Sequence, residues 1–363
     1  MDTRPNPRAP GEPDPDLECL LLSPTDPLTG RPRAGALRRL MHPPPGVKYT
    51  LATDRFRYPA RAANYEFNPV NVGLVVARFA LEHLAPLNQK GKALVHSFFW
   101  DLRKFERRWV HESDQSFGQF LSSYNNVKGL VRRSTNEGFS SYLNSRWCAG
   151  VVTWSDWARR GFVEDGVDPS KVFVIPPPFE TVDAKKDHPG CNVLYIGRDF
   201  QRKGGGAALR AFRSLKEDEA RLTFVGPVGT PAARLEVKSD RRITQTDSSS
   251  GKRLTEDVWP TTDVLLLPTR ADAFAITVVD AMRRGVPVVS TKIPAVAEVV
   301  QDGVSGLLSE VGDGEGLRRN LKKLVEDPEL RRRLGEGGRQ RAKELFSPEK
   351  VGRSLMRVYS LAR

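Results

Sequence analysis

The sequence has few cysteines, no long uncharged apolar run and no apolar leader. Only three cysteines occur and they form no CxxC pair, which disfavours a disulfide scaffold and a zinc site. The longest apolar stretch, 70–87, is interrupted by Arg78 and Glu82, so we expect no bilayer-spanning helix. Because no apolar segment follows a basic start at the N-terminus, we expect no signal peptide and a cytoplasmic location.

Residues 1–16 contain five prolines and almost no apolar side chains, so we expect a disordered tail. The chain's only Asp-x-Asp pattern, Asp14-Pro15-Asp16, falls in this tail. That pattern holds a divalent ion in metal-dependent sugar transferases, but here its place predicts no metal site.

The formal net charge of +13 favours anionic partners or surfaces. Basic residues within 103–108 surround Phe105 and Trp109. This mixture suits peripheral association with an anionic membrane, and a solvated basic face is the alternative. The sequence has no aromatic-rich single-strand platform and no recognition-helix motif, so we expect no nucleic acid partner.

Short apolar runs alternate with helical segments along the chain, which predicts parallel sheets. The length suits two cores, and the polar segment after residues 176–178, three consecutive prolines, is the best boundary. We therefore expect an α/β protein with two Rossmann-like, doubly wound domains, over 17–180 and 181–346, and a C-terminal helix in 347–363.

Three local expectations refine this picture. A helix is expected over 70–84, and one helical segment over 116–143. The section 226–251 shows no regular pattern apart from a basic turn and a Ser/Gly loop.

The loop Gly197–Gly206 follows an apolar strand and opens a helix. Its glycines permit close backbone approach, and Arg198 and Lys203 can both point at one anion. The loop is neither GxGxxG nor GxxxxGK[ST], so a dinucleotide fingerprint and a P-loop are unsupported. It is predicted to bind a diphosphate, with an ordinary charged loop as the alternative.

The stretch 264–290 is typical of strand, loop, helix and strand, with Asp272 in the loop and Asp280 in the first turn of the helix. A helix start of this kind suits an anion such as a diphosphate. The alternative is that Asp272 caps a turn and that Thr277-x-x-Asp280 is a capping box.

His96 and His111 each end an apolar strand, where open α/β sheets place their ligand-binding loops. A structural role is the alternative for each.

Five motifs then follow one another in a specific order. They are Val-Ile-Pro-Pro-Pro (174–178), Tyr-Ile-Gly-Arg-Asp-Phe-Gln-Arg-Lys-Gly-Gly (195–205), Phe-Val-Gly (224–226), Leu-Pro-Thr-Arg-Ala-Asp-Ala-Phe (267–274) with Asp280-Ala-Met and Gly285-Val-Pro-Val-Val, and Asp-Gly-Val-Ser-Gly-Leu-Leu (302–308). In this order they resemble the retaining GT-B glycosyltransferases of family 4. The resemblance is strong in the second half of the chain and in the first half rests on 155–178 and the alternating pattern.

The resemblance implies two domains that face each other across a cleft, with the acceptor bound mainly by the first and a nucleotide-sugar donor mainly by the second. It also implies that the final helix crosses back onto the first domain. Arg198 and Lys203 would hold the donor diphosphate, in the loop that contains Gly197 and Gly204.

The family's two glutamates fall on Asp272 and Asp280, which would contact the sugar hydroxyls and the ribose respectively. Both are one methylene shorter here, by on the order of 1.5 Å. Backbone N–H groups of Phe274, Ala275 and Ile276 would approach the sugar and the phosphates.

The family also carries a first-domain histidine near the donor sugar, which would be His96 or His111, with the position of His111 preferred. No metal and no cofactor besides the donor are implied, because Arg, Lys and a helix N-terminus supply the electrostatic stabilisation.

The sequence thus predicts a retaining, metal-independent glycosyltransferase that moves a sugar from a nucleoside diphosphate to a hydroxyl of a glycan, lipid or small molecule. The shortened carboxylates leave open a catalytically weakened sugar-nucleotide-binding protein. A phosphorylase or epimerase on the same fold is a further alternative. The nucleobase, the sugar and the acceptor are not identified.

Overall fold

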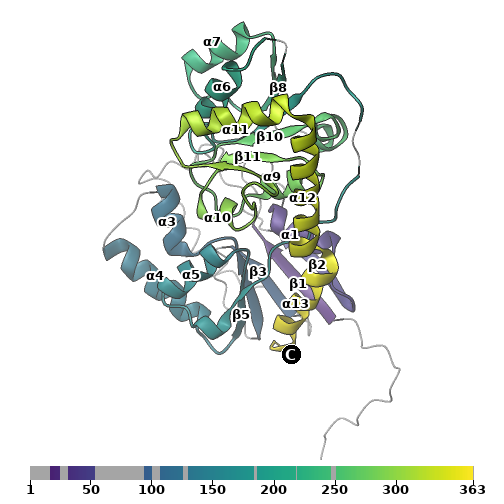
Figure 1. Cartoon of the computed structure of the whole chain (residues 1–363). Helices are drawn as coiled ribbons and strands as arrows, with labels where there is room; N and C mark the ends of the chain where they lie inside the picture. The colour runs from purple at the N-terminus through teal and green to yellow at the C-terminus, as the bar shows by residue number, and fades with distance from the viewer. Residues whose placement is uncertain are drawn as a thin grey trace, which may run out of the picture.

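The computed structural model describes residues 17–24, 32–53, 94–99, 107–125, 130–183, 186–217, 219–246 and 251–362. The tail 1–16 and the helix expected over 70–84 lie outside these residues. Two parallel sheets of six strands form the centres of two domains, which appear one above the other in Figure 1. The expected α/β fold with two doubly wound domains is confirmed.

The first sheet has the strand order β2-β1-β3-β4-β5-β6. Its strands are β1 (Leu17–Ser23), β2 (Val47–Thr53), β3 (Leu94–Phe98), β4 (Trp109–Ser113), β5 (Cys148–Thr153) and β6 (Val172–Val174). The described helices of this domain are α1 (Ala34–Met41), α3 (Phe117–Asn125), α4 (Leu130–Leu143) and α5 (Asp156–Glu164). The single helical segment expected over 116–143 is therefore two helices.

Alternate residues of the first sheet face two separate apolar clusters, as the two-residue period of a strand requires. Leu22 and Val151 pack with Phe139 of α4 and Phe162 of α5 on one face. On the other face, Leu21 packs with α1 and with a helix from the C-terminal end of the chain. Both faces are covered by helices, which is why the strands are apolar on both sides.

The second sheet has the order β12-β11-β10-β7-β8-β9. Its strands are β7 (Asn192–Ile196), β8 (Arg221–Val225), β9 (Ile243–Thr246), β10 (Val264–Leu267), β11 (Val288–Thr291) and β12 (Gly306–Ser309). Its helices include α6 (Gly205–Arg213), α7 (Pro231–Ser239), α8 (Gly251–Arg253), α9 (Ile276–Met282), α10 (Pro294–Ala297) and α11 (Gly314–Glu326). The section 226–251, expected to be irregular, contains α7 and β9.

Helix α7 has a recognisable start, because Thr230 accepts a hydrogen bond from the Ala233 N–H at 3.1 Å and Pro231 occupies the first turn. The capping signal was therefore present in the sequence, but α7 buries only Ala233 and Val237. The apolar stripe is too narrow to give a clear helical period.

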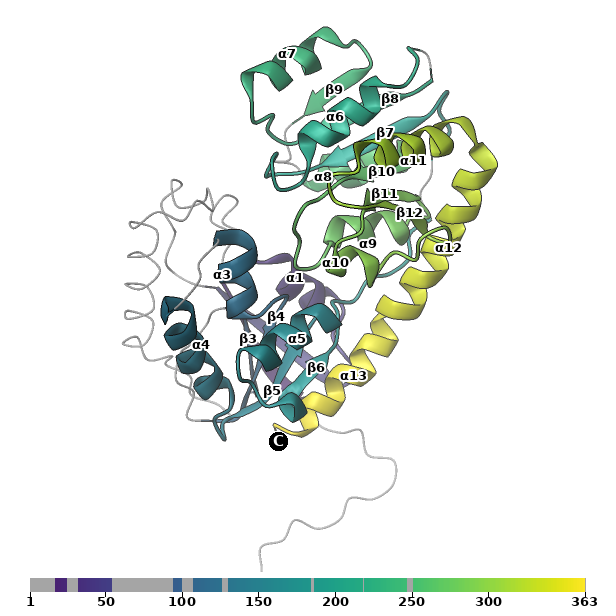
Figure 2. The ribbon, with the colours of Figure 1, turned by 60° about the vertical axis from the view of Figure 1, so that its left-hand side comes forward.

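The last two helices connect the domains. Helix α12 (Pro328–Phe346) runs down the side of the molecule, and α13 (Pro348–Ser360) lies against the first sheet (Figures 1 and 2). Val351, Leu355, Val358 and Tyr359 of α13 are buried in the same cluster as Leu21 and Val110. The C-terminal helix thus completes the core of the first domain.

Candidate active site

The loops that follow β7 and β10 are joined by an ion pair between Lys203 and Asp272. Both side chains are largely buried, with exposed fractions of 14% and 11%. The backbone reinforces this contact, because Arg270 N–H donates to the Arg202 carbonyl at 2.7 Å and Arg202 Nη1 donates to the Ala271 carbonyl at 2.8 Å. Two predicted site loops, 69 residues apart in sequence, therefore form one surface.

Gly204 makes the close packing of these loops possible. It has φ of +73° and stands at the N-cap of α6, a conformation that favours glycine. A Cβ at this position would collide with the Pro268 carbonyl, so the loop after β10 lies directly on the helix start. Gly197 is equally enclosed, by Tyr195 and the Lys203 Cβ. The positive end of the α6 dipole lies next to Lys203 in sequence and suits an anion.

Arg198 is exposed in the turn between Gly197 and Lys203. The structure therefore places it in the same loop as Lys203, at the carboxyl end of β7.

Asp280 lies in the second turn of α9 and is surrounded by three arginines. Arg38 Nη2 of α1 lies 3.2 Å from both carboxylate oxygens, Arg283 Nε donates to Oδ1 at 2.7 Å, and Arg284 Nη1 donates to Oδ1 at 3.1 Å. Burial acts to raise the pKa of Asp280, but the three guanidinium groups outweigh it and hold the pKa below its usual range.

The capping box considered for Thr277 and Asp280 is wrong. Helix α9 begins at Ile276, its N-cap is Ala275, and no side chain caps it. Asp280 is therefore not in the first turn, and its carboxylate is directed to arginines, among them one of the first domain. Phe274 and Ala275 are buried immediately before the helix.

His96 is buried within the first domain, in a polar network on the α13 side of the sheet. Its Nδ1 lies 2.7 Å from the Tyr359 hydroxyl and its Nε2 lies 2.9 Å from Glu112 Oε2. Glu112 also accepts hydrogen bonds from Arg39 Nε at 3.1 Å and Trp154 Nε1 at 2.7 Å. Burial lowers the pKa of His96, which favours the neutral ring, although Glu112 opposes this effect.

His111 is buried on the opposite face of the same sheet, among Trp109, Phe139 and Phe162. Neither ring nitrogen has a hydrogen-bond partner among the residues that the structure describes, and burial lowers the pKa of His111 to about 3. The two histidines thus lie on different faces of the first sheet, and the structure brings neither into contact with Lys203 or Asp272. Trp109 is also buried, so it does not belong to an exposed basic and aromatic surface.

The two domains meet through an aromatic contact next to Asp272. Trp154, which directly follows β5, has its ring 5.5 Å from that of Phe274 in an edge-to-face arrangement. Glu298 of the second domain accepts hydrogen bonds from the Asp156 and Trp157 N–H groups at the start of α5, at 2.8 and 2.7 Å. We call the surface formed by Arg33, Asp114, Trp154, Lys203, Asp272 and Phe274 the domain junction.

Several residues at or near the junction were missed by the sequence analysis: Arg38, Glu112, Asp114 and Trp154. Asp114 was recognisable in principle, because it directly follows β4 at the carboxyl end of a central strand. The interdomain partners Arg38 and Trp154 had no such signal, because nothing in a local pattern shows which distant residue a side chain will meet.

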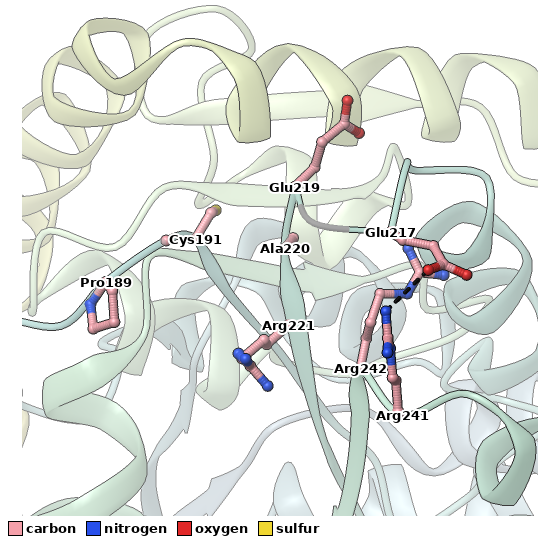
Figure 3. A pocket seen from close by; sticks show the side chains of 9 residues that line it. Pro189, Cys191, Glu217, Glu219, Ala220, Arg221, Arg241 and Arg242 are labelled. Atoms are coloured by element: carbon pink, nitrogen blue, oxygen red, sulfur yellow. Dashed lines mark hydrogen bonds and ion pairs between the residues drawn. The ribbon is translucent and has the colours of Figure 1, made fainter.

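The cavity shown in Figure 3 is a different place. It has a volume of about 520 Å³ and is lined by Cys191, Glu219, Arg221 and Arg242, among others. These residues stand at the amino ends of β7, β8 and β9, opposite the loops that carry Lys203. Arg242 is already paired with Asp240 at 2.8 Å.

Two searches for other kinds of site gave negative results within the described residues. No three His, Cys, Asp or Glu side chains are grouped as metal ligands would be. No helix in this part of the chain has the length and apolar character needed to span a membrane.

In a comparison with known proteins, the second half of the chain matches the model of one protein family. Residues 181–341 match the model of the glycosyl transferases group 1. The chain is 35% identical over 97 residues to N-acetyl-alpha-D-glucosaminyl L-malate synthase of Bacillus anthracis, covering 27% of this chain and 26% of that protein. It is 28% identical over 250 residues to the MMP alpha-(1->4)-mannosyltransferase of Mycolicibacterium hassiacum, covering 65% and 59%. Both matches span less than two thirds of the relative's own length.

Among solved structures, the chain is similar in fold to Anabaena HepE in complex with UDP-glucose. The TM-score is 0.65 and the sequence identity 15%, and the similarity covers 94% of this chain and 99% of that one. The two-domain arrangement is therefore shared over nearly the whole chain.

Proposed function

We propose that this chain, whose second domain belongs to the group 1 glycosyl transferases and whose fold is the GT-B fold, transfers a sugar from a nucleoside diphosphate donor to a hydroxyl acceptor. The observation that carries the proposal is the ion pair between Lys203 and Asp272. It places a cation suited to a diphosphate beside a carboxylate suited to sugar hydroxyls, at the start of a helix. In a nucleotide sugar the diphosphate is bonded directly to the sugar, so a cation for the diphosphate beside a carboxylate for the sugar hydroxyls suits such a donor.

Lys203, Arg198 and the N-terminus of α6 would stabilise the diphosphate as it leaves. Negative charge grows on the leaving oxygen when the bond to the sugar breaks, and fixed positive groups lower the energy of that state more than that of the bound donor. Lys203 would then change partners, from Asp272 alone to Asp272 and the phosphate. Asp272 would accept hydrogen bonds from the sugar and fix its orientation.

We further propose that transfer proceeds with retention and needs no metal. Lys203, Arg198 and the N-terminus of α6 offer fixed positive charge to the leaving diphosphate, which supports departure of the donor without a metal. The acceptor hydroxyl would attack on the face from which the diphosphate departs, and its proton would pass to a leaving phosphate oxygen. Retained anomeric configuration in the product and full activity in EDTA are the expected results.

Asp280 would bind the ribose hydroxyls while remaining paired with arginine. Its carboxylate accepts several hydrogen bonds already, so the ribose must share it with Arg38 or replace Arg38. Loss of one guanidinium contact would leave two others on the same carboxylate.

A second candidate function is nucleotide-sugar binding with weak transfer. It is favoured by one observation: both Asp272 and Asp280, each shorter than the family's glutamate, are held by basic side chains. In this case the donor would bind but turnover would be very slow.

One experiment separates these functions. The full chain is screened by thermal shift against UDP, GDP and their glucose and mannose conjugates, since a bound donor raises the melting temperature. Donor consumption is then followed with and without simple glycan and lipid acceptors. Stabilisation with turnover supports transfer, and stabilisation without turnover supports binding alone. If no nucleoside diphosphate or its sugar conjugate stabilises the protein, the proposed donor site is wrong.

A further inference from the structure

Asp114 is held at the domain junction by the geometry of the first sheet. Strands β4 and β5 are paired in parallel with Ser113 opposite Thr153, and the Thr153 hydroxyl donates to the Ser113 carbonyl at 2.9 Å. Asp114 and Trp154 are therefore the next residues along two neighbouring strands. The Ser113 hydroxyl donates to the Gln115 carbonyl at 2.8 Å, which fixes the turn that contains Asp114.

Trp154 connects this position to the second domain. Its indole N–H is tied to Glu112, its ring is packed on Gly35, where a Cβ would collide with it, and its edge meets Phe274. Phe274 comes two residues after Asp272. A carboxylate of the first domain and a carboxylate of the second thus flank one aromatic contact.

The Asp114 side chain is half-buried, and its carboxyl group accepts a hydrogen bond from its own backbone N–H, but one of its oxygens lacks a donor in the described part of the chain. Its Oδ1 is inaccessible to solvent and accepts no hydrogen bond from the described residues. Other carboxylates near the junction differ, since Glu112 and Asp280 each accept hydrogen bonds from guanidinium groups. An enclosed carboxyl oxygen without a donor is unfavourable, and this favours a site that a ligand completes.

The charges around Asp114 come from three elements. Arg33 at the start of α1 and Arg202 in the loop after β7 act to lower its pKa, whereas Asp272 in the loop after β10 acts to raise it. Burial is the largest effect and raises the pKa of Asp114 to about 7. The group therefore takes up or releases a proton near neutral pH, and ligand binding can change its charge.

We propose that Asp114 contacts the transferred sugar and contributes to its selection, by accepting a hydrogen bond from a sugar hydroxyl on the side opposite Asp272. This inference rests on the proposed function. A sugar hydroxyl suits the ionised form of Asp114, because a hydroxyl donates to a carboxylate in a charge-assisted hydrogen bond, whereas a phosphate would repel that form. The sugar would then be held between one carboxylate of each domain.

The test compares the affinity for the nucleotide sugar with that for the nucleotide alone. Titration calorimetry of the full chain uses UDP with UDP-glucose and GDP with GDP-mannose, at pH 6 and pH 8. Asp114→Ala is expected to weaken binding of the sugar conjugate by about tenfold and to leave binding of the nucleotide unchanged. The wild type is expected to bind the conjugate more tightly at pH 8 than at pH 6, and Asp114→Asn is expected to lose this pH dependence.

The nucleotide affinity shows that a variant is folded, and Glu164→Gln, an exposed charge on α5, is the control. If Asp114→Ala binds the sugar conjugate as tightly as the wild type does, relative to the nucleotide, the inference is overturned while the proposed function stands. If the wild type binds neither nucleotides nor conjugates, the proposed function fails and the inference fails with it.

Discussion

Arg38 of the first domain and Asp280 of the second form an ion pair, with Arg38 Nη2 at 3.2 Å from each carboxylate oxygen. The guanidinium also lies over the Phe179 ring, 3.6 Å from its centroid, so it is fixed from two sides. We expect Arg38→Met and Asp280→Asn to be coupled by about 1–2 kcal/mol in a double-mutant cycle of unfolding free energies. Additive effects would show that the pair does not stabilise the contact between domains.

Asp280→Ala tests the ribose role separately. Ribose is common to a nucleotide and to its sugar conjugate, so both should bind about tenfold more weakly and by the same factor. Calorimetry with the pair of ligands measures this ratio. Unchanged affinity for both would limit Asp280 to joining the domains.

Lys203→Ala is expected to lower kcat/KM for transfer by at least about 100-fold, as removal of a fixed group that stabilises the leaving charge does. Lys203→Arg keeps the charge and should recover part of the activity. Lys292→Ala is the matched control, because Lys292 is exposed and 3.9 Å from Glu310. Wild-type kinetics in Lys203→Ala would refute the assignment of the loop.

Asp272→Asn should separate binding from transfer. Without the carboxylate, Lys203 is released to the phosphates, so the nucleotide alone should bind at least as tightly as it does to the wild type. Transfer should fall by about 10–100-fold, because the sugar loses a charged acceptor. The measurements are calorimetry with UDP or GDP and initial rates with the active donor. A parallel loss of nucleotide affinity would contradict this division of roles.

Glu112→Gln is expected to destabilise the protein by about 3 kcal/mol at pH 7, because it leaves the buried Arg39 guanidinium without its ionic partner. The pKa of Glu112 is held below its usual range by Arg39 and His96, against the effect of burial. A lowered folded-state pKa contributes stability above the unfolded value and loses it as the pH falls. The difference from the wild type in chemical denaturation should therefore shrink below about pH 4.

Asp114→Asn should have the opposite effect on stability. The raised pKa of Asp114, about 7, means that the folded protein holds a proton that the unfolded chain has released above about pH 4. Stability from this group therefore falls between about pH 4 and 7 and stays low above. Without ligand, Asp114→Asn should melt a few degrees higher than the wild type at pH 8, and at the same temperature near pH 4.

Alternation of apolar runs was sufficient to predict two parallel sheets, because a strand buried on both faces must be apolar throughout. Ser155 shows that local chemistry can be equally direct, since a serine at the start of a helix is a common cap and its side chain accepts a hydrogen bond from the Ala158 N–H at 3.1 Å at the start of α5. The break between two consecutive helices was not predicted, because α3 and α4 were expected as one helical segment.

The sequence predicted the loops of the candidate site, but it did not predict which distant side chains contact the residues of those loops. The glycines and Lys203 are consecutive in sequence, so their relation is a matter of local geometry. The ion pairs of Asp280 and the burial of His96 and His111 depend on contacts between elements far apart in the chain. The carboxyl ends of β3 and β4 do lie near the domain junction, as the sequence analysis expected of strand ends. The side chains of His96 and His111 are nevertheless buried on the two faces of the sheet. Asp114, the residue directly after β4, lies at the junction instead.

Because α13 packs in the first domain, its position limits the order in which the two domains can fold during synthesis. Tyr359 is buried in the first domain, where its hydroxyl lies 2.7 Å from His96 Nδ1 and 2.8 Å from the Tyr49 hydroxyl. The core of the first domain thus contains a position that the ribosome makes only after the whole second sheet. The core of the second domain ends with Phe346 of α12, which precedes Tyr359 in the chain, so the second domain can finish folding before the first.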